Sequence, residues 1–194
     1  MILFFDTETT GVPKNYKAPV HDLDNWPRVI QLAYAVISDD GKEIHEAECN
    51  LIRPDGWVIP KEKFWIDNGF STEKNIREGI HITVALNGLR NAIDFCHTIV
   101  AHNMDFDFKI VAAEMIRAGI KAENTPRKVC TMKASTELLQ LPGPFGFKWP
   151  KLVELHNYLF MEPFTGAHDA LNDVMACAKC YFELQRRQLI PQLS

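Results

Sequence analysis

The chain has 194 residues, of which 46% are hydrophobic and 24% are charged, and these values are typical of a globular protein with one full core. Its formal net charge of −4, with no long run of either sign, argues against a protein that grips nucleic acid through a large basic face. There is no signal-peptide pattern and no apolar stretch of about 20 residues, and the five cysteines have no framework spacing. We therefore predict a single domain over residues 1–194, with a cytoplasmic location and no membrane association.

The predicted elements alternate between strands and helices. The chain opens on a short apolar strand from residue 2, and further strands are predicted over 28–38, 42–53, 98–101 and 129–132. Helical patterns cover 61–66, 71–79, 83–96, 104–118, 133–139, 151–160 and 167–188. Residues 12–27, 54–60 and 141–150 are interpreted as loops because they are rich in Pro, Gly and polar residues. This order predicts an α/β domain with a mixed sheet.

The first strand carries two acidic residues where it ends, Asp6 and Glu8. Side chains two residues apart on a strand point the same way, about 6–7 Å apart along the backbone. Two carboxylates facing one point beside a buried strand repel each other and lose hydration, so they need a cation or a shifted pKa. The alternative is a strand end in solvent with two unrelated surface acids, and this stretch alone leaves both interpretations open.

Two predicted helices also carry an acid among their apolar residues. On the last helix, Asp173 falls inside the apolar stripe, whereas Asp169 lies nearer its border. On the helix over 104–118, Asp107 lies at the edge of the apolar face and Asp105 points towards solvent. A buried structural ion pair is the alternative for Asp173, and a half-exposed surface acid is the alternative for Asp107.

His168 lies just before the last helix, close in sequence to Asp173. A loop histidine beside a metal site is suited to act as a general base near neutral pH. Oxygen-only ligands favour Mg²⁺ or Mn²⁺ over Zn²⁺, and two such ions about 3.5–4 Å apart form the clamp used in phosphodiester cleavage. Cys177 and Cys180 spell C-x-x-C, but inside a helix and without a second ligand pair, so we interpret them as core residues.

Three short motifs follow one another along the chain. The pattern D-x-E-x-T-G matches residues 6–11, H-N-x-x-F-D matches residues 102–107, and H-D-A-x-x-D matches residues 168–173. In this order they resemble the motifs of the DEDD-type 3′–5′ exonucleases, in the branch with a catalytic histidine (DEDDh). That branch includes the proofreading epsilon subunit of bacterial DNA polymerase III, ribonuclease T and oligoribonuclease.

The resemblance implies a ribonuclease H-like fold, a mixed five-stranded sheet flanked by helices. It implies two Mg²⁺ ions, with Mn²⁺ as a substitute, and a general base that takes the proton of the attacking water. The implied metal ligands are Asp6, Glu8, Asp107 and Asp173, and these four with His168 are the implied catalytic residues.

By analogy, Thr9 and Asn103 contact the terminal nucleotide. The stretch NGFS over 68–71 takes the place of the family's H-G-I/M-S/T motif. Its Phe70 either stacks on a base or packs in the interior.

The sequence thus predicts a metal-dependent 3′–5′ exonuclease that removes nucleoside monophosphates from single-stranded or frayed 3′ ends of DNA, with RNA as the other polymer. The alternatives are an oligoribonuclease-like or small phosphodiester hydrolase, and a non-catalytic nucleic-acid-binding module on the same fold. Loss of one acid or of the histidine would mark the non-catalytic module, and all five residues are present. No segment indicates a polymerase partner or an oligomeric state. The sequence does not distinguish among proofreading, repair and RNA turnover. It also leaves the role of the loop over 12–27 open.

Overall fold

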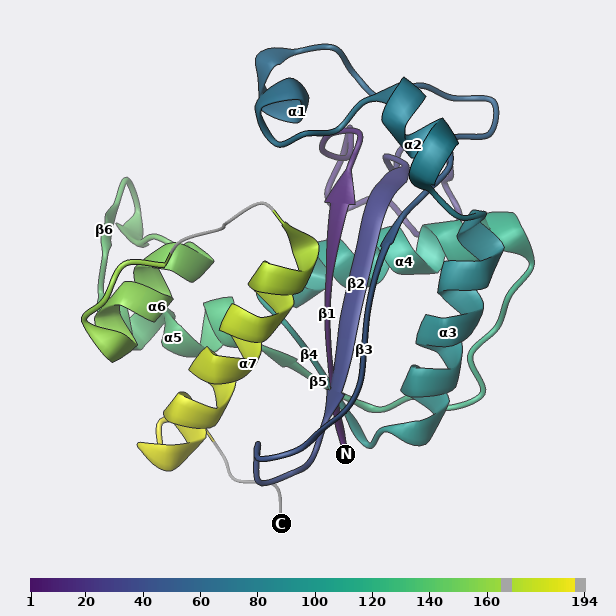
Figure 1. Ribbon diagram of the computed structural model, residues 1–194. Helices are drawn as coiled ribbons and strands as arrows, with labels where there is room; N and C mark the ends of the chain where they lie inside the picture. The colour runs from purple at the N-terminus through teal and green to yellow at the C-terminus, as the bar shows by residue number, and fades with distance from the viewer. Residues whose placement is uncertain (165–168, 191–194) are drawn as a thin grey trace.

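The protein is described here by a computed structural model that covers residues 1–164 and 169–190. Its centre is a five-stranded sheet in the order β3-β2-β1-β4-β5, shown in Figure 1. The strands are β1 (Ile2–Thr9), β2 (Val29–Ile37), β3 (Ile44–Leu51), β4 (Thr98–Ala101) and β5 (Arg127–Cys130). Because β1 pairs antiparallel with β2 and parallel with β4, the sheet is mixed, as predicted.

Helices cover both faces of the sheet (Figure 1). They are α1 (Lys63–Asp67), α2 (Thr72–Glu78), α3 (Ile82–Phe95), α4 (Met104–Ala118), α5 (Thr131–Leu139), α6 (Leu152–Phe160) and α7 (Ala170–Arg186). One hydrophobic cluster joins the sheet to α3 and α4, and a second joins the other face to α6 and α7. Within residues 1–164 and 169–190, none of these helices combines the length and the apolar character needed to cross a bilayer.

The side chains of β1 alternate between these two clusters. Leu3 and Phe5 belong to the cluster with α3 and α4, whereas Ile2 and Phe4 belong to the cluster with α6 and α7. Successive residues of a strand point to opposite faces, so the strand is buried on both sides and reads as a continuous apolar run. The same alternation directs Asp6 and Glu8 towards α7 and the intervening Thr7 towards α4.

β1 is longer than its parallel neighbour. Only Ile2 to Phe4 pair with β4, which ends at Ala101, so the next residues of β1 have no strand on that edge. The first turn of α4 occupies this space. The chain enters α4 through Asn103, whose backbone is left-handed (φ 76°, ψ 46°), a conformation that Asn adopts more easily than most residues.

Most element bounds differ from the prediction by one or two residues, and three differences are larger or change the type of structure. Residues 141–150 are not loop throughout, because β6 (Pro142–Gly143) and β7 (Gly146–Phe147) form a small hairpin whose chain reverses at residues 144–145. The fifth strand begins at Arg127 and ends at Cys130, since its register is set by pairing with β4. The last helix covers 170–186 and not 167–188, and residues 165–168 lie outside the described part of the chain.

The loop over 12–27 is held against α4. Its Trp26 is buried, and Arg117 Nη2 on α4 donates a hydrogen bond of 2.7 Å to the Trp26 carbonyl. Within the loop, Lys14 N donates to Asn25 O. The loop is therefore packed on the same helix that carries Asp107.

Candidate active site

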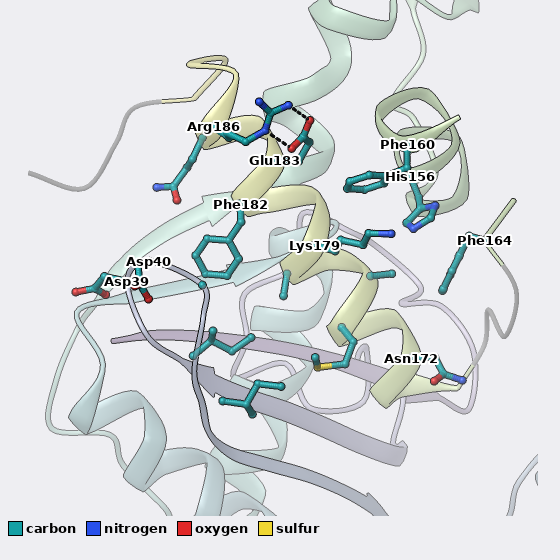
Figure 2. A pocket seen from close by; sticks show the side chains of 17 residues that line it. Asp39, Asp40, His156, Phe160, Phe164, Asn172, Lys179, Phe182, Glu183 and Arg186 are labelled. Atoms are coloured by element: carbon teal, nitrogen blue, oxygen red, sulfur yellow. Dashed lines mark hydrogen bonds and ion pairs between the residues drawn. The ribbon is translucent and has the colours of Figure 1, made fainter. Parts of the chain in front are cut away.

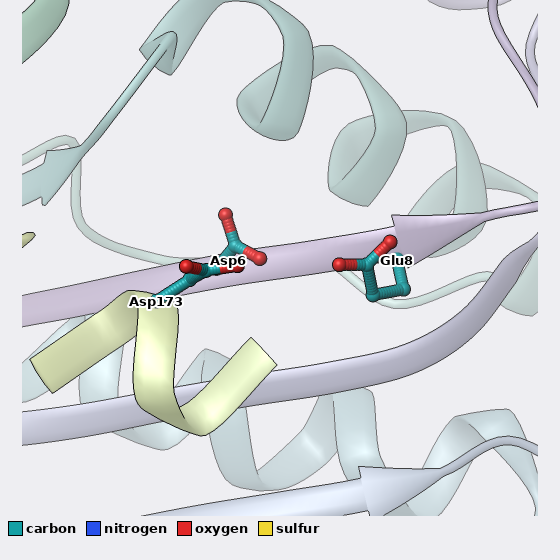
Figure 3. A group of neighbouring side chains, drawn as sticks. All are labelled: Asp6, Glu8 and Asp173. Carbon is teal, nitrogen blue, oxygen red and sulfur yellow. The ribbon is translucent and has the colours of Figure 1, made fainter. Parts of the chain in front are cut away.

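Three carboxylates meet at the end of β1. Asp6, Glu8 and Asp173 each offer one oxygen, and these three oxygens lie within 4.8 Å of one another. Figure 3 shows Asp6 and Glu8 on β1 and Asp173 on the first turn of α7. The amino end of a helix favours negative charge, so α7 offers a suitable place for Asp173. The structure thus brings together three of the four acids that the sequence predicts.

Asp107 reaches the same end of β1 from α4. Its side chain is only 3% exposed, and its Oδ1 accepts hydrogen bonds from Thr7 N (3.1 Å) and Thr7 Oγ1 (2.8 Å). It lies outside the group of three, yet its negative charge helps to raise the pKa of Asp6. The sequence pattern leaves Asp107 at the edge of its helix face, and the structure buries it because β4 stops short. Asp107 Oδ1 takes the place of a strand partner's carbonyl as the acceptor for Thr7 N, and sequence reasoning missed the role of Thr7.

A glutamine on β2 positions the start of α7. Gln31 Oε1 accepts a hydrogen bond of 3.1 Å from Ala170 N, the first residue of α7. Gln31 also lies opposite Glu8 in the β1–β2 register. Asp169 caps the helix, with its Oδ1 accepting from Asn172 N. Gln31 was missed by sequence reasoning, although it is the one amide in the otherwise apolar strand VIQLAYAVI.

The electrostatics of the cluster oppose full ionisation. Burial, followed by the charges of Asp107, Asp173 and Glu8, raises the pKa of Asp6 well above its usual value. Burial and then Asp173 raise the pKa of Glu8 to about 8. Burial raises the pKa of Asp107 to about 7, although the Thr7 hydrogen bonds hold it down. Near pH 7 these acids cannot all carry full negative charge unless a cation compensates them.

The donor set fits a hard divalent cation. Asp6, Glu8 and Asp173 offer only carboxylate oxygens, the ligands that Mg²⁺ and Mn²⁺ prefer. Cys177 is buried near this group, but burial raises its thiol pKa well above the usual value, so it stays protonated. Cys180 is buried as well, and both fit the predicted core role. The three acids therefore form a candidate site for a divalent cation held by carboxylate oxygens.

The residues predicted to contact substrate lie near the end of β1 or beyond it. Thr9 Oγ1 donates a hydrogen bond of 2.6 Å to Gly11 O, and the Thr9 carbonyl accepts from Trp65 Nε1 at 3.0 Å. Phe70 is buried in a small cluster with Ile59, which is the packing alternative of the sequence analysis. Substrate contact by either residue stays a prediction.

The second motif has a structural role that the sequence did not reveal. His102 Nε2 lies 2.9 Å from Pro150 O and its Nδ1 lies 2.9 Å from Thr131 Oγ1. A carbonyl only accepts, so Nε2 donates to Pro150 and Nδ1 accepts from Thr131. Burial lowers the His102 pKa to about 4, so this side chain is neutral near pH 7. Asn103 follows directly at the start of α4, and His168 lies outside the described residues.

A separate cavity of about 930 Å³ runs along the outer face of α7, as Figure 2 shows. It lies between α7, α6 and the turn from β2 to β3, and Lys179 and Phe182 project into it. None of the four acids lines this cavity. The acidic site is therefore distinct from it and lies at the end of the sheet.

The comparison with known proteins agrees with this geometry. The RNase_T family model, described as exonuclease, matches residues 3–181. The chain belongs to this exonuclease family. The predicted resemblance to DEDD-type 3′–5′ exonucleases and the prediction of an exonuclease enzyme are both confirmed by this match. No curated protein matches the sequence of this RNase_T-family exonuclease.

Solved structures share the fold of this exonuclease. E. coli exonuclease I in complex with a dT13 oligonucleotide has a TM-score of 0.75 at 17% identity over 96% of this chain. Exonuclease X in complex with 5′ overhanging duplex DNA has a TM-score of 0.65 at 19% identity, covering 99% of this chain and 95% of its own. The chain spans about 41% of the length of exonuclease I. The predicted α/β, ribonuclease H-like fold is confirmed.

Proposed function

We propose that this protein, acting as one exonuclease domain over residues 1–194, removes nucleoside monophosphates from 3′ ends of single-stranded or frayed DNA, with RNA as the alternative polymer. The observation that carries the proposal is the meeting of Asp6, Glu8 and Asp173 within 4.8 Å, with Asp107 beside them. The neighbouring folds bound to dT13 and to overhanging duplex DNA support a DNA strand with an accessible end as substrate.

We assign two Mg²⁺ ions, replaceable by Mn²⁺, to Asp6, Glu8, Asp107 and Asp173. When bound, such ions neutralise the acids and stabilise the charge that develops on the attacking and leaving oxygens of a phosphodiester. The protein's part is to hold the carboxylates in place. Asp6 and Glu8 lie on a strand whose other residues are buried, and Asp107 is oriented by two hydrogen bonds from Thr7. Sites on rigid elements keep such geometry better than sites on loops.

His168 is assigned as the general base that takes the proton of the attacking water. Its sequence neighbour Ala170 is anchored to β2 through Gln31, so the chain enters α7 at a defined place. We expect His168→Ala to lower turnover with little change in metal affinity. Titration with Mn²⁺ alongside the rate measurement checks this. A metal affinity that fell in step with the rate would make His168 a ligand and not the base.

The decisive experiment follows hydrolysis of matched DNA and RNA oligonucleotides, labelled at the 5′ end, with Mg²⁺ and with chelator. A descending ladder of products in Mg²⁺ is expected, and no products in chelator. Asp6→Asn and Asp173→Asn should each abolish hydrolysis while the fold is kept. Asp105→Asn is the matched control, because Asp105 lies in the same motif as Asp107 but is exposed and paired with Lys133.

Unchanged turnover in Asp6→Asn or Asp173→Asn would refute the assignment of these acids. Substrates of graded length, from a dinucleotide to a 16-mer, test the alternative of a short-oligonucleotide or small-phosphodiester hydrolase. That alternative requires turnover restricted to the shortest substrates. Hydrolysis of the DNA series but not of the RNA series would select DNA as the polymer.

A further inference from the structure

The β6–β7 hairpin and the residues after it present three aromatic side chains to solvent. We call residues 142–149 the aromatic hairpin. Phe145 is fully exposed (101%), Trp149 is 63% exposed and Phe147 is 45% exposed. Isolated exposed apolar residues are ordinary, but three large aromatics within five residues form a patch of the kind that marks an interaction site.

The segment of the chain that contains the aromatic hairpin has the opposite net charge to the whole protein. Residues 127–151 contain five basic side chains and one acidic side chain, although the whole chain has a net charge of −4. Lys151 lies beside the hairpin, and Lys148 lies in it with its ammonium paired to Glu154 at 2.5 Å. Exposed aromatics together with lysines match single-stranded nucleic acid, because bases stack on the rings and phosphates attract the ammonium groups. An apolar protein partner would use the rings but not the positive charge.

The aromatic hairpin is fixed in relation to the acidic site. Lys148 N donates a hydrogen bond to Leu141 O at 2.9 Å, which closes the hairpin. The next anchor is Pro150, whose carbonyl accepts from His102 Nε2. His102 stands two residues before α4, the helix that carries Asp107. Figure 1 shows the hairpin beside α6, on the same side of the sheet as α7.

We propose that the aromatic hairpin binds the single strand of the substrate several nucleotides away from the 3′ end that the acids hold. In this arrangement bases stack on Phe145 and Trp149, and Lys151 lies close to a phosphate. The inference rests on the proposed function and deepens it, since it names the path of the strand. It gives the enzyme a preference for strands long enough to reach from the acids to the hairpin.

The test compares a double variant, Phe145→Ala with Trp149→Ala, with the matched control Phe95→Ala. Phe95 is about as exposed as Trp149 (68% against 63%), but it ends α3, which packs on the other face of the sheet from α6 and α7. Binding of 5′-fluorescein dT16 and dT3 is measured by anisotropy in the Asp173→Asn background. Stacking on one ring contributes roughly five- to 150-fold in affinity. We expect the double variant to bind dT16 at least tenfold more weakly, with unchanged dT3 binding and an unchanged control.

Activity in the otherwise wild-type chain gives a second measurement. The double variant should raise KM for dT16 by a similar factor and leave dinucleotide hydrolysis unchanged. Lys151→Gln should lower the slope of log affinity against log salt by about 0.7, the value for one phosphate contact on a single strand. Phe145→Tyr keeps a ring and should restore binding. Equal unfolding midpoints for the wild type and each of these variants would show that the exposed substitutions leave the fold intact.

Two results would overturn the inference. Unchanged dT16 affinity in the double variant would show that the strand does not use the hairpin, and the patch would then belong to another class of partner. An equal loss with dT3 and dT16 would mean that the hairpin maintains the acidic site and binds no strand. Failure of the proposed function is distinguishable, because it shows as absent hydrolysis by the wild-type chain whatever the oligonucleotide affinity.

Discussion

In the metal-free protein, the acidic cluster should make stability fall as the pH rises. The pKa of Glu8 is raised from 4.5 to about 8, first by burial and then by the charges of Asp173 and Asp107. The folded state therefore holds a proton that the unfolded state releases between these two pH values. The resulting destabilisation is absent below about pH 4.5, grows as the pH rises and is complete above about pH 8. Glu8→Gln removes the charge and should remove this loss.

The displacement of the Glu8 pKa from 4.5 to about 8 sets the magnitude. Without screening it corresponds to roughly 5 kcal/mol of unfolding free energy. The Glu8 side chain is partly exposed, and solvent screening lowers the expected effect to about 2 kcal/mol. For a chain of this length, about 2 kcal/mol raises Tm by roughly 4–8 °C. In chelator, the Tm of Glu8→Gln should exceed that of the wild type by this amount at pH 8, and the two Tm values should match near pH 5.

Thermal and urea unfolding in EDTA at pH 5, 6.5 and 8 measures the effect. Glu137→Gln is the matched control, since Glu137 is an exposed glutamate on α5 and should behave as the wild type at every pH. Addition of Mg²⁺ or Mn²⁺ should stabilise the wild type more than Glu8→Gln, because a ligand of the folded state raises its stability. A wild-type stability that is flat from pH 5 to pH 8 in EDTA would refute the reasoning.

Two further predictions concern residues that hold the site together. Thr7→Val removes the 2.8 Å hydrogen bond to Asp107, so the Asp107 pKa should rise further above about 7 and the pH profile of hydrolysis should move to higher pH by about one unit. Thr7→Ser keeps the hydroxyl and should retain the wild-type profile. An unmoved profile in Thr7→Val would contradict the role of this bond. Asn103→Ala should lower the free energy of unfolding by about 1 kcal/mol because of the left-handed backbone, as urea unfolding would show. Asn103→Gly should keep stability but raise KM through loss of the amide, and an unchanged KM would remove Asn103 from the substrate contacts.

The helices and strands were largely predictable because they depend on local pattern. The alternation and length of apolar runs mark β1, α4 and α7 to within a few residues. The errors fall where pairing decides the outcome, as at β5, whose first residue is set by its partner on β4. The hairpin at 142–147 was missed because its proline and glycine content also fits an irregular loop.

The sequence by itself determined which carboxylates to group, because the three motifs that carry Asp6, Glu8, Asp107 and Asp173 follow the order found in DEDD-type exonucleases. Strand and helix spacing alone left each acid with an alternative interpretation. Only the tertiary structure decided how the site is held. Asp107 is buried against Thr7, 100 residues away, because β4 ends before β1 does. Gln31 anchors α7 across 139 residues, and His102 joins the second motif to the segment that carries the aromatic hairpin. These contacts depend on where separate elements end relative to one another, and no local periodicity in the chain encodes that.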